Sequence, residues 1–261
     1  MARLQNKVAI VTGAAQGIGK GIAHAMAQEG ATVALWDISE KVHATANAMC
    51  NSGLKAVAYT VDVAMEDQIK ETAREIAQNE GRVDILVNNA GIAYFAPFMA
   101  MTPDLRDKIF GVNFNGVWNC TAAVIPMMIA QRYGRIVNVS SVTGPRVATP
   151  GLTAYAAAKG AVAAFTRSLA LEVAAYAITV NALLPGFIDT ALTKPMAADL
   201  HMQEDEFAAW LGKSIPLQRM GTIEEVGNLA VFLASDAAQY ITGQEIVIDG
   251  GNIIQEVKGL K

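Results

Sequence analysis

The sequence Val8-Ala9-Ile10-Val11-Thr12-Gly13-Ala14-Ala15-Gln16-Gly17-Ile18-Gly19 decides the fold, because it joins a short apolar run to a glycine-rich turn. The run predicts a buried strand, and the turn opens a helix-length segment. Such a turn lets the backbone approach a pyrophosphate, and the helix presents free N–H groups and the positive end of its dipole. The segment predicts a dinucleotide site; the alternative is an ordinary strand-to-helix turn. The candidate cofactor residues are Gly13, Gln16, Gly17, Ile18 and Gly19.

The same order, a β-branched run and then a helix-length segment, repeats along the chain. Glycines such as Gly30, Gly53 and Gly81 close the helical segments, as expected where a helix ends in a left-handed residue. Several runs are apolar at consecutive positions, which is typical of a parallel sheet covered by helices on both faces. The fold class is therefore α/β, with a doubly wound seven-stranded parallel sheet. The predicted strands are Val8–Val11, Thr32–Trp36, Val57–Val61, Val83–Val87, Ile136–Val139, Ile178–Val180 and Ile246–Ile248.

The composition bounds the domain organisation. The chain has 261 residues, 52% of them hydrophobic and 17% charged, so it can bury a large core. We predict one domain over residues 1–261, with a helical substrate lid at about 190–214 and a short tail at 252–261. No apolar run is long enough to cross a bilayer and no export signal is recognisable, which predicts a cytoplasmic protein with no membrane partner.

The charge pattern points to a small-molecule substrate. The net charge is −4 and no basic run is present, which argues against nucleic acid as a partner. The two cysteines, Cys50 and Cys120, lack metal-ligand spacing and are predicted to be small buried residues within helices. We therefore expect no metal site.

A carboxylate follows the second predicted strand. Asp37 lies 18 positions after Gly19, close to the offset at which an acidic residue meets the adenosine ribose. It would accept a hydrogen bond from the 2′-hydroxyl and repel a 2′-phosphate, and Ile38 and Ser39 supply no cation to compensate. NAD is therefore predicted as the cofactor over NADP, with Lys20 and Lys41 as the rival cations. The alternative for Asp37 is a turn or helix-capping residue.

The segment Tyr155-Ala156-Ala157-Ala158-Lys159 lies in an alanine-rich stretch that predicts a helix. Residues four apart share a helical face, so the phenol and the ammonium can point into one cleft. A free phenol has a pKa of about 10 and needs roughly 4 kcal/mol to reach neutrality. An ammonium about 5 Å away supplies about 3.3 kcal/mol at an effective dielectric of about 20. We predict that Lys159 lowers the pKa of Tyr155; the alternative is a surface contact.

Five motifs stand together in one order. Their order and spacing resemble those of the short-chain dehydrogenase/reductase family, from Lys7 to Gly251. The resemblance implies a Rossmann-type fold and an NAD(P)-dependent oxidoreductase, and only residues 252–261 lie outside it. The motifs are Thr12-Gly13-x-x-x-Gly17-Ile18-Gly19, Asn88-Asn89-Ala90-Gly91, Ser141, Tyr155-x-x-x-Lys159 and Pro185-Gly186.

The resemblance also implies roles for the matching residues. Tyr155 would be the acid/base, and Lys159 its electrostatic partner and a ligand of the nicotinamide ribose. Ser141 would hydrogen-bond the substrate oxygen, and Asn113 would hold a water in the proton relay. Ser140 is rejected, because strand alternation turns neighbours to opposite sides. In the cofactor cleft, Asp62 and Val63 would contact adenine, Asn89, Ala90 and Gly91 would line the cleft, and Ile188 and Thr190 would hold the carboxamide.

Structural alternatives remain for several of these residues. Ser141 could be a satisfied strand-end hydroxyl, Asn113 a buried polar contact, and Asn88 or Asn89 a tie between adjacent strands. If the implied roles hold, hydride passes between C4 of the nicotinamide and the carbinol carbon of a secondary alcohol, while Tyr155 moves the proton without a metal.

The residues expected to line the substrate pocket are mainly apolar, which favours a small or medium ketone and its alcohol. Arg146 and His201 could still bind an anionic tail. The expected lining residues are Ala93, Tyr94, Phe95, residues 142–147, Phe187, Met196, Leu200, Met202 and Trp210.

Two other functions stay open. A 3-oxoacyl-thioester reductase, acting on a carrier protein or coenzyme A, would share every motif. Arg132 matches one carrier-docking position of that group, but Tyr176 stands where a second arginine is expected, and Asp37 argues against NADPH. A non-catalytic dinucleotide-binding regulator would usually have lost the catalytic Ser, Tyr or Lys. The resemblance also suggests a homotetramer in which helices at about 104–131 and 154–176 pack against their symmetry mates.

Overall fold

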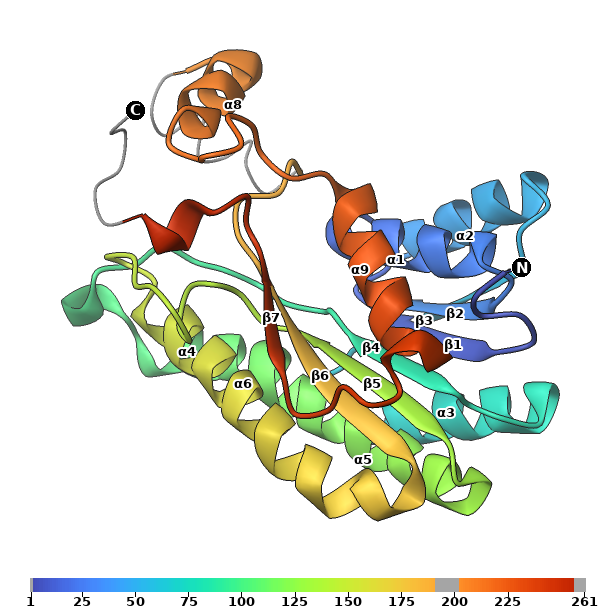
Figure 1. The fold of residues 1–261 in the computed structure, drawn as a ribbon. Coiled ribbons are helices and arrows are strands. Elements are labelled where there is room, and N and C mark those ends of the chain that lie inside the picture. Colours follow the sequence, from blue (N-terminus) through green and yellow to red (C-terminus); the bar gives the residue numbers. More distant parts are fainter. Residues whose placement is uncertain (1, 191–201, 256–261) are drawn as a thin grey trace.

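The sheet has seven parallel strands in the order β3-β2-β1-β4-β5-β6-β7, as Figure 1 shows. The structure is a computed structural model that describes residues 2–190 and 202–255. The chain runs outward from β1 to β3 and resumes at β4 on the other side of β1, which is the doubly wound, Rossmann-type arrangement. The predicted fold class and all seven predicted strands are confirmed. The strands are β1 (Val8–Thr12), β2 (Thr32–Asp37), β3 (Ala56–Thr60), β4 (Ile85–Asn88), β5 (Gly134–Val139), β6 (Ile178–Pro185) and β7 (Glu245–Ile248).

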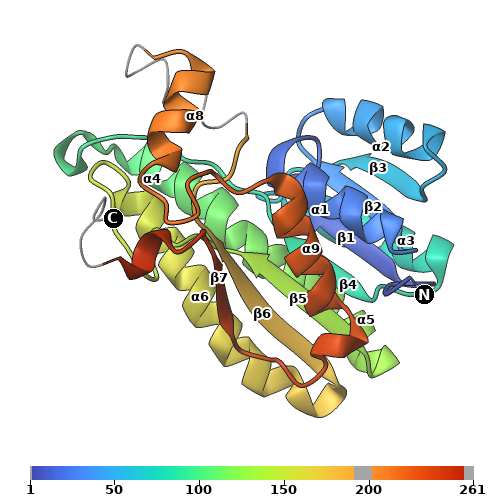
Figure 2. The ribbon, with the colours of Figure 1, turned by 45° about the horizontal axis from the view of Figure 1, so that its top comes forward.

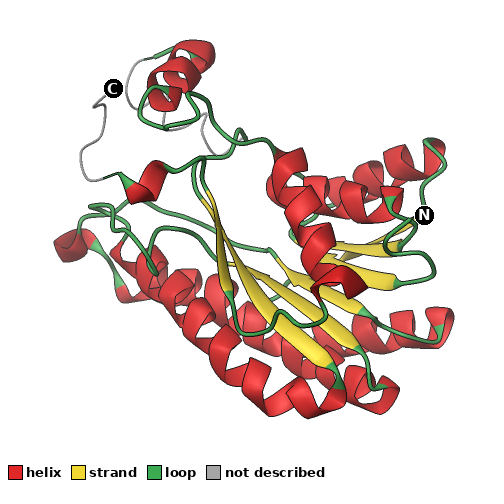
Figure 3. Cartoon of the chain, viewed as in Figure 1, coloured by secondary structure: helices red, strands yellow, loops and turns green. Residues whose placement is uncertain are grey.

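Helices cover both faces of the sheet, and Figure 3 shows the resulting layers. Helices α1, α2 and α9 pack on one face, and α3, α5 and α6 pack on the other. The helices are α1 (Gly17–Gln28), α2 (Lys41–Asn51), α3 (Glu66–Glu80), α4 (Pro103–Phe110), α5 (Gly116–Gln131), α6 (Thr153–Val173), α8 (Glu204–Gly212) and α9 (Ile223–Ala234).

Two hydrophobic cores explain why β1 is an unbroken apolar run. All five of its residues are buried, although successive side chains point to opposite faces. Ala9 and Val11 pack in the core under α1 and α9, whereas Val8 and Ile10 pack in the core that α3 and α5 cover. Both faces of the strand therefore need apolar side chains.

The predicted helix at about 104–131 is present, but it is not one regular α-helix. A π-helical turn, η2 (Gly111–Asn115), joins α4 to α5. Such a turn adds a residue to the helix and is frequent at functional sites. Here it holds Asn113, which is completely buried. Pro126 lies inside α5 without ending it.

The second long helix, predicted at about 154–176, is α6 followed by a 3₁₀ turn at Ala174–Tyr176. It runs antiparallel to the strands, so its first turns lie at the carboxyl ends of β5 and β6. Cys120 is buried as predicted, but the prediction of a buried Cys50 is wrong. Met49 and its neighbours fill the buried face of α2 instead.

Helix α8 stands apart from the sheet, above the carboxyl ends of the strands (Figure 2). Its buried residues Phe207 and Leu211 pack with Ile215 and Phe187. The helix falls in the segment for which a lid is predicted, and Met202 packs against the same cluster. Residues 191–201 of that prediction, with Met196, Leu200 and His201, lie outside the described residues, as do residues 256–261 of the tail. No helix of the described segments is long and apolar enough to span a membrane.

Candidate active site

The glycine-rich turn between β1 and α1 packs tightly against the chain that leaves β4. Gly13 has a φ of +65°, and a Cβ there would lie 2.9 Å from the Ala90 Cα. A Cβ on Gly19 would overlap the carbonyl oxygen of Gly13. Glycine is therefore required at both positions. Gln16, the N-cap of α1, makes no side-chain capping bond, so it leaves the first N–H groups of α1 available to an anion.

Two side chains hold this turn in place. Asn89 Nδ2 donates to the carbonyl oxygens of Thr12, at 2.9 Å, and Gly13, at 3.1 Å. In return, Thr12 Oγ1 accepts from the backbone N–H groups of Asn89 and Ala90, each at 3.0 Å. The Asn89 side chain thus braces the turn, which agrees with the structural alternative. Sequence reasoning missed Thr12; its signal was a hydroxyl at the end of an otherwise apolar strand.

Asp37 ends β2 beside the same turn. Its Oδ2 accepts from the N–H of Ala15 and its Oδ1 from the N–H of Ser39, both at 2.9 Å. Asp62 lies just beyond the neighbouring β3 and accepts from the N–H of Ala64 at 2.9 Å. Val63 is buried. The candidate adenosine residues therefore gather at the carboxyl ends of β2 and β3.

The candidate catalytic side chains come from β5 and α6. Lys159 Nζ donates to the Val139 carbonyl oxygen at 2.8 Å and lies 5.8 Å from the centre of the Tyr155 ring. The Ser141 hydroxyl lies close enough to the Tyr155 phenol to lower its pKa through hydrogen bonding. Ser140 Oγ donates to the Lys159 carbonyl oxygen at 2.9 Å, so its hydroxyl proton is held by the backbone of α6. The choice of Ser141 over Ser140 stays a prediction.

Gly91 connects this group to the π-helical turn. A Cβ on Gly91 would lie 3.0 Å from Asn113 Oδ1 and 3.4 Å from Lys159 Nζ. The Asn113 amide is held by Ile92, whose N–H donates to Asn113 Oδ1 and whose carbonyl oxygen accepts from Asn113 Nδ2, both at 2.8 Å. Asn113, Lys159 and the chain after β4 therefore meet at one point.

The segment after β6 brings Thr190 close to the glycine-rich turn. Ile188 pairs with Gly221 in an isolated bridge and is buried. The Thr190 side chain lies 3.9 Å from the position that a Cβ on Gly17 would occupy. Ile18 packs against the core under α1. The candidate carboxamide residues therefore lie over the glycine-rich turn.

The pKa of Tyr155 departs from the sequence prediction. Burial raises the pKa of the phenol above 10, and the hydrogen bond with Ser141 acts in the opposite direction. Burial also lowers the pKa of Lys159 to about 8, and its Nζ is directed at the Val139 carbonyl oxygen. In the chain without a cofactor, the pKa of Tyr155 is therefore raised by burial, and the predicted lowering by Lys159 is not found. Its lowering beside a bound nicotinamide stays a prediction.

Two basic residues that the sequence suggested for binding have partners within the chain. Arg146 is paired with Glu245 at 3.1 Å, so its charge is already compensated. Arg132 ends α5 and donates to the Ala175 carbonyl oxygen at 3.2 Å. Because α5 runs antiparallel to the strands, Arg132 lies at the edge of the sheet opposite Ser141.

Asn88, the first residue of the Asn88-Asn89-Ala90-Gly91 motif, binds other side chains of the core. Asn88 Nδ2 donates to Asn138 Oδ1 at 2.8 Å and to Thr121 Oγ1 at 3.1 Å, which confirms that Asn88 ties β4 to β5. No group of three or more His, Cys, Asp or Glu side chains within residues 2–190 and 202–255 is arranged to hold a metal ion.

Comparison with known proteins adds independent support. A family described as enoyl-(acyl carrier protein) reductase matches residues 13–252. The oxidoreductase UcpA of Escherichia coli K12 is 44% identical over 257 residues, 98% of each chain. The 3-oxoacyl-[acyl-carrier-protein] reductase FabG of Thermotoga maritima is 46% identical over 97% of this chain and 100% of its own. A gluconate 5-dehydrogenase from Burkholderia cenocepacia J2315, solved with NADP and tartrate, has a TM-score of 0.90 and 36% identity over 97% of both chains.

The chain belongs to the short-chain dehydrogenase/reductase family. The resemblance carried by the five sequence motifs is therefore confirmed. The protein is an oxidoreductase that uses an NAD(P) dinucleotide.

Proposed function

We propose that the protein is an NAD(H)-dependent oxidoreductase that interconverts a secondary alcohol and a ketone, with Tyr155 as the acid/base. The observation that carries this proposal is the convergence of Ser141, Tyr155, Lys159 and Asn113 on the edge of the sheet that also holds the glycine-rich turn. Convergence of a hydroxyl pair, a buried ammonium and an anion-binding turn fits proton and hydride transfer at one carbon.

The residues present fit the dinucleotide. Gly13 and Gly19 form a cradle that a Cβ would fill, and the open N-terminus of α1 suits the pyrophosphate. Asp37 would hold the adenosine ribose, and Asp62 with Val63 would contact adenine. Ile188 and Thr190 would hold the carboxamide, and Lys159 the nicotinamide ribose. When bound, the nicotinamide supplies hydride transfer at C4.

The proton chemistry belongs to the chain's own side chains. The N–H of Thr143 donates to Ser141 Oγ at 3.1 Å and orients the Ser141 hydroxyl. When substrate binds, the proton of this hydroxyl would be donated to the substrate oxygen. The Tyr155 phenolate takes the hydroxyl proton of the alcohol in oxidation, and the phenol returns it in reduction. Lys159 stabilises the phenolate from one helical turn away. Asn113 would hold a relay water through which the proton reaches solvent.

The NAD preference rests on Asp37. Both carboxylate oxygens are already held by backbone N–H groups, which fixes the negative charge where a 2′-phosphate would bind. Ile38 is 68% exposed and offers no cation. Two structural relatives were solved with bound NADP, so NADP is the cofactor against which the NAD preference must be tested. We expect kcat/KM with NADH to exceed that with NADPH by at least about tenfold, since one misplaced charge costs more than about 1.4 kcal/mol; a preference for NADPH would contradict the proposal.

The second candidate is reduction of a 3-oxoacyl thioester, favoured by the 46% identity to FabG of Thermotoga maritima. Against a carrier-protein substrate stands Tyr176, which occupies the position where a second docking arginine beside Arg132 is expected. Tyr94 and Phe95 follow the Asn89-Ala90-Gly91 segment and are exposed, which favours a substrate with apolar surface. A panel of ketones, diketones, polyols and 3-oxoacyl thioesters, each assayed with both cofactors, distinguishes the candidates by their kcat/KM values.

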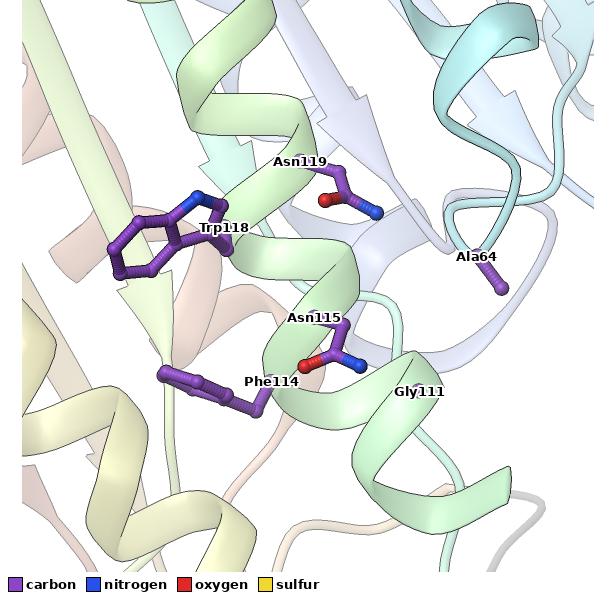
Figure 4. Close-up of a pocket in the computed structure, with 6 residues that line it drawn as sticks. All are labelled: Ala64, Gly111, Phe114, Asn115, Trp118 and Asn119. Carbon is purple, nitrogen blue, oxygen red and sulfur yellow. The ribbon is translucent and has the colours of Figure 1, made fainter. Parts of the chain in front are cut away.

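We also propose the homotetramer that the family resemblance suggests. Trp118 of α5 is 54% exposed and contacts Phe114 edge-to-face and Phe165 at a tilt, with centroid distances of 6.3 and 5.3 Å. A pocket of about 360 Å³ adjoins these rings. Figure 4 shows the residues that line it, which are Ala64, Gly111, Phe114, Asn115, Trp118 and Asn119. An exposed aromatic face of this kind is typical of a protein interface, so we assign it to a second copy of the chain.

A further inference from the structure

An ion cluster joins the loop after Ser141 to the edge strand of the sheet. Glu245 begins β7, and its side chain is only 6% exposed. Arg146 Nη2 lies 3.1 Å from Glu245 Oε2, and Arg167 of α6 donates a hydrogen bond to Glu245 Oε1. A buried carboxylate is costly unless charges of opposite sign surround it. Glu245 therefore ties together the loop at residues 142–147, α6 and β7.

The loop at residues 142–147 is folded on itself. The N–H groups of Arg146 and Val147 both donate to the Val142 carbonyl oxygen at 3.0 Å, and the N–H of Gly144 donates to the Val147 carbonyl oxygen at 2.8 Å. Thr143 and Val147 also form an isolated bridge. These bonds make the loop a compact unit, and the Arg146 side chain extends from it to Glu245.

The same loop touches the catalytic group on its other side. Ser141 Oγ accepts from the N–H of Thr143 at 3.1 Å. Gly144 has a φ of +111°, and a Cβ there would overlap the Ala156 carbonyl oxygen and lie 3.1 Å from the Gly160 nitrogen. Ala156 and Gly160 are the residues next to Tyr155 and Lys159. The position of the loop on α6 therefore sets the position of Ser141 relative to Tyr155.

We propose that the Arg146–Glu245 ion pair is a positioning device that holds the loop against α6 and so fixes the Ser141 hydroxyl beside the Tyr155 phenol. The inference rests on the proposed function. Arg167 has a different part: it reaches the same carboxylate from α6, which is held by its own helical hydrogen bonds. Arg167 therefore neutralises Glu245 without tethering the loop.

The two arginines provide a matched pair of variants. Arg146→Met and Arg167→Met each remove one guanidinium from Glu245 and leave the other in place, so their effects on Tm should be similar. We expect Arg146→Met to lower kcat for the best alcohol about tenfold, because small misplacements of catalytic groups have effects of this order. Its substrate KM and NAD Kd should stay within about twofold. Arg167→Met should keep kcat within about twofold, and Arg146→Lys should recover most of the lost kcat.

Hydrogen–deuterium exchange of the chain without substrate or cofactor gives a second readout. Loss of the tether should speed exchange of the Thr143 and Val147 amides in Arg146→Met and leave it unchanged in Arg167→Met. Equal losses of kcat in the two variants, or wild-type exchange in Arg146→Met, would overturn the inference. If wild type turns over no alcohol, the proposed function fails, whereas the exchange rates still decide whether the tether exists.

Discussion

Lys159 is a buried lysine, with 4% of its surface exposed, and burial lowers its pKa from 10.5 to about 8. Between these two pH values the unfolded chain binds more protons than the folded chain, so the stability contributed by this residue rises with pH. Below pH 8 both states are protonated, and the cost of the buried charge is largest. The residue is therefore kept at a cost in stability, as is common for functional groups.

This linkage gives a first prediction. The unfolding free energy of wild type, measured relative to that of Lys159→Met, should increase by about 2–3 kcal/mol as the pH rises from 7 to 10. Urea unfolding of both proteins at pH 7, 8, 9 and 10 measures the difference, and the subtraction removes groups that titrate in both. A difference that is independent of pH would contradict the burial of a charged Lys159.

Ser141 gives a second prediction at this scale. Its hydrogen bond lowers the pKa of Tyr155 against the effect of burial, and alcohol oxidation needs the phenolate. In Ser141→Ala the pKa of Tyr155 should rise, so the pH profile of kcat/KM for oxidation should move to higher pH. Ser140→Ala is the control, because the Ser140 hydroxyl binds the Lys159 carbonyl oxygen instead. Equal profiles for Ser141→Ala and Ser140→Ala would refute this account of the phenol.

The sequence spacing predicted that the Tyr155 and Lys159 side chains lie close together, but it did not predict the direction of their pKa shifts. The four-residue spacing of Tyr155 and Lys159 was sufficient to place both on one face of α6. The desolvation of the Tyr155 phenol, and the hydrogen bond from the Lys159 ammonium to the Val139 carbonyl oxygen, both depend on how β5 packs against α6. No local pattern reports that contact, so the direction of the pKa shift of Tyr155 required the structure.

At the scale of single elements, the glycine-rich turn is the part that most restricts sequence. Gly13 combines a positive φ with a close approach to the Ala90 Cα. Gly53 ends α2 with a φ of +79°, and nothing lies within 4 Å of the Cβ it would carry. The two glycines therefore share the backbone conformation but differ in their surroundings.

The third prediction uses this pair. Gly53→Ala should cost about 1 kcal/mol of unfolding free energy through its left-handed backbone and leave the NAD Kd unchanged. Gly13→Ala should lose more stability and weaken NAD binding by at least about tenfold, because the turn must move from Ala90. Calorimetric titration with NAD and urea unfolding measure both. An unchanged NAD Kd in Gly13→Ala would contradict the placement of the pyrophosphate at this turn.

Elements differ in how far the sequence specifies them. The apolar runs and glycines located the seven strands and the helix ends, because backbone conformation and burial on two faces leave local signals. The π-helical turn at Gly111–Asn115 left none, since it is held by Asn113 binding Ile92 from the chain after β4. The exposure of Cys50 likewise depends on which face of α2 meets the sheet.

At the scale of the whole molecule, the aromatic group of Phe114, Trp118 and Phe165 presents an exposed ring, that of Trp118, at the surface of α5 and α6. Trp118 and Trp210 are exposed to a similar degree, 54% and 53%, but Trp210 lies on α8, away from that face. A tetramer that uses α5 and α6 should need the first tryptophan and not the second.

The fourth prediction follows. Light scattering should give wild type a mass about four times the 27.6 kDa of the chain. Trp118→Lys should reduce this mass, because a charge cannot be buried in an apolar interface without a partner, and Trp210→Lys should not. A wild-type mass near that of one chain would exclude the assembly.

The most direct test of the central claim, that the Tyr155 phenol moves the proton beside a bound nicotinamide, compares wild type with Tyr155→Phe. We predict that kcat for the best alcohol with NAD falls by about 10²- to 10⁴-fold, the usual effect of losing a general acid/base. The NAD Kd should stay within about twofold and the Tm should change little, because the ring is kept. Turnover of Tyr155→Phe near the wild-type rate would contradict the claim.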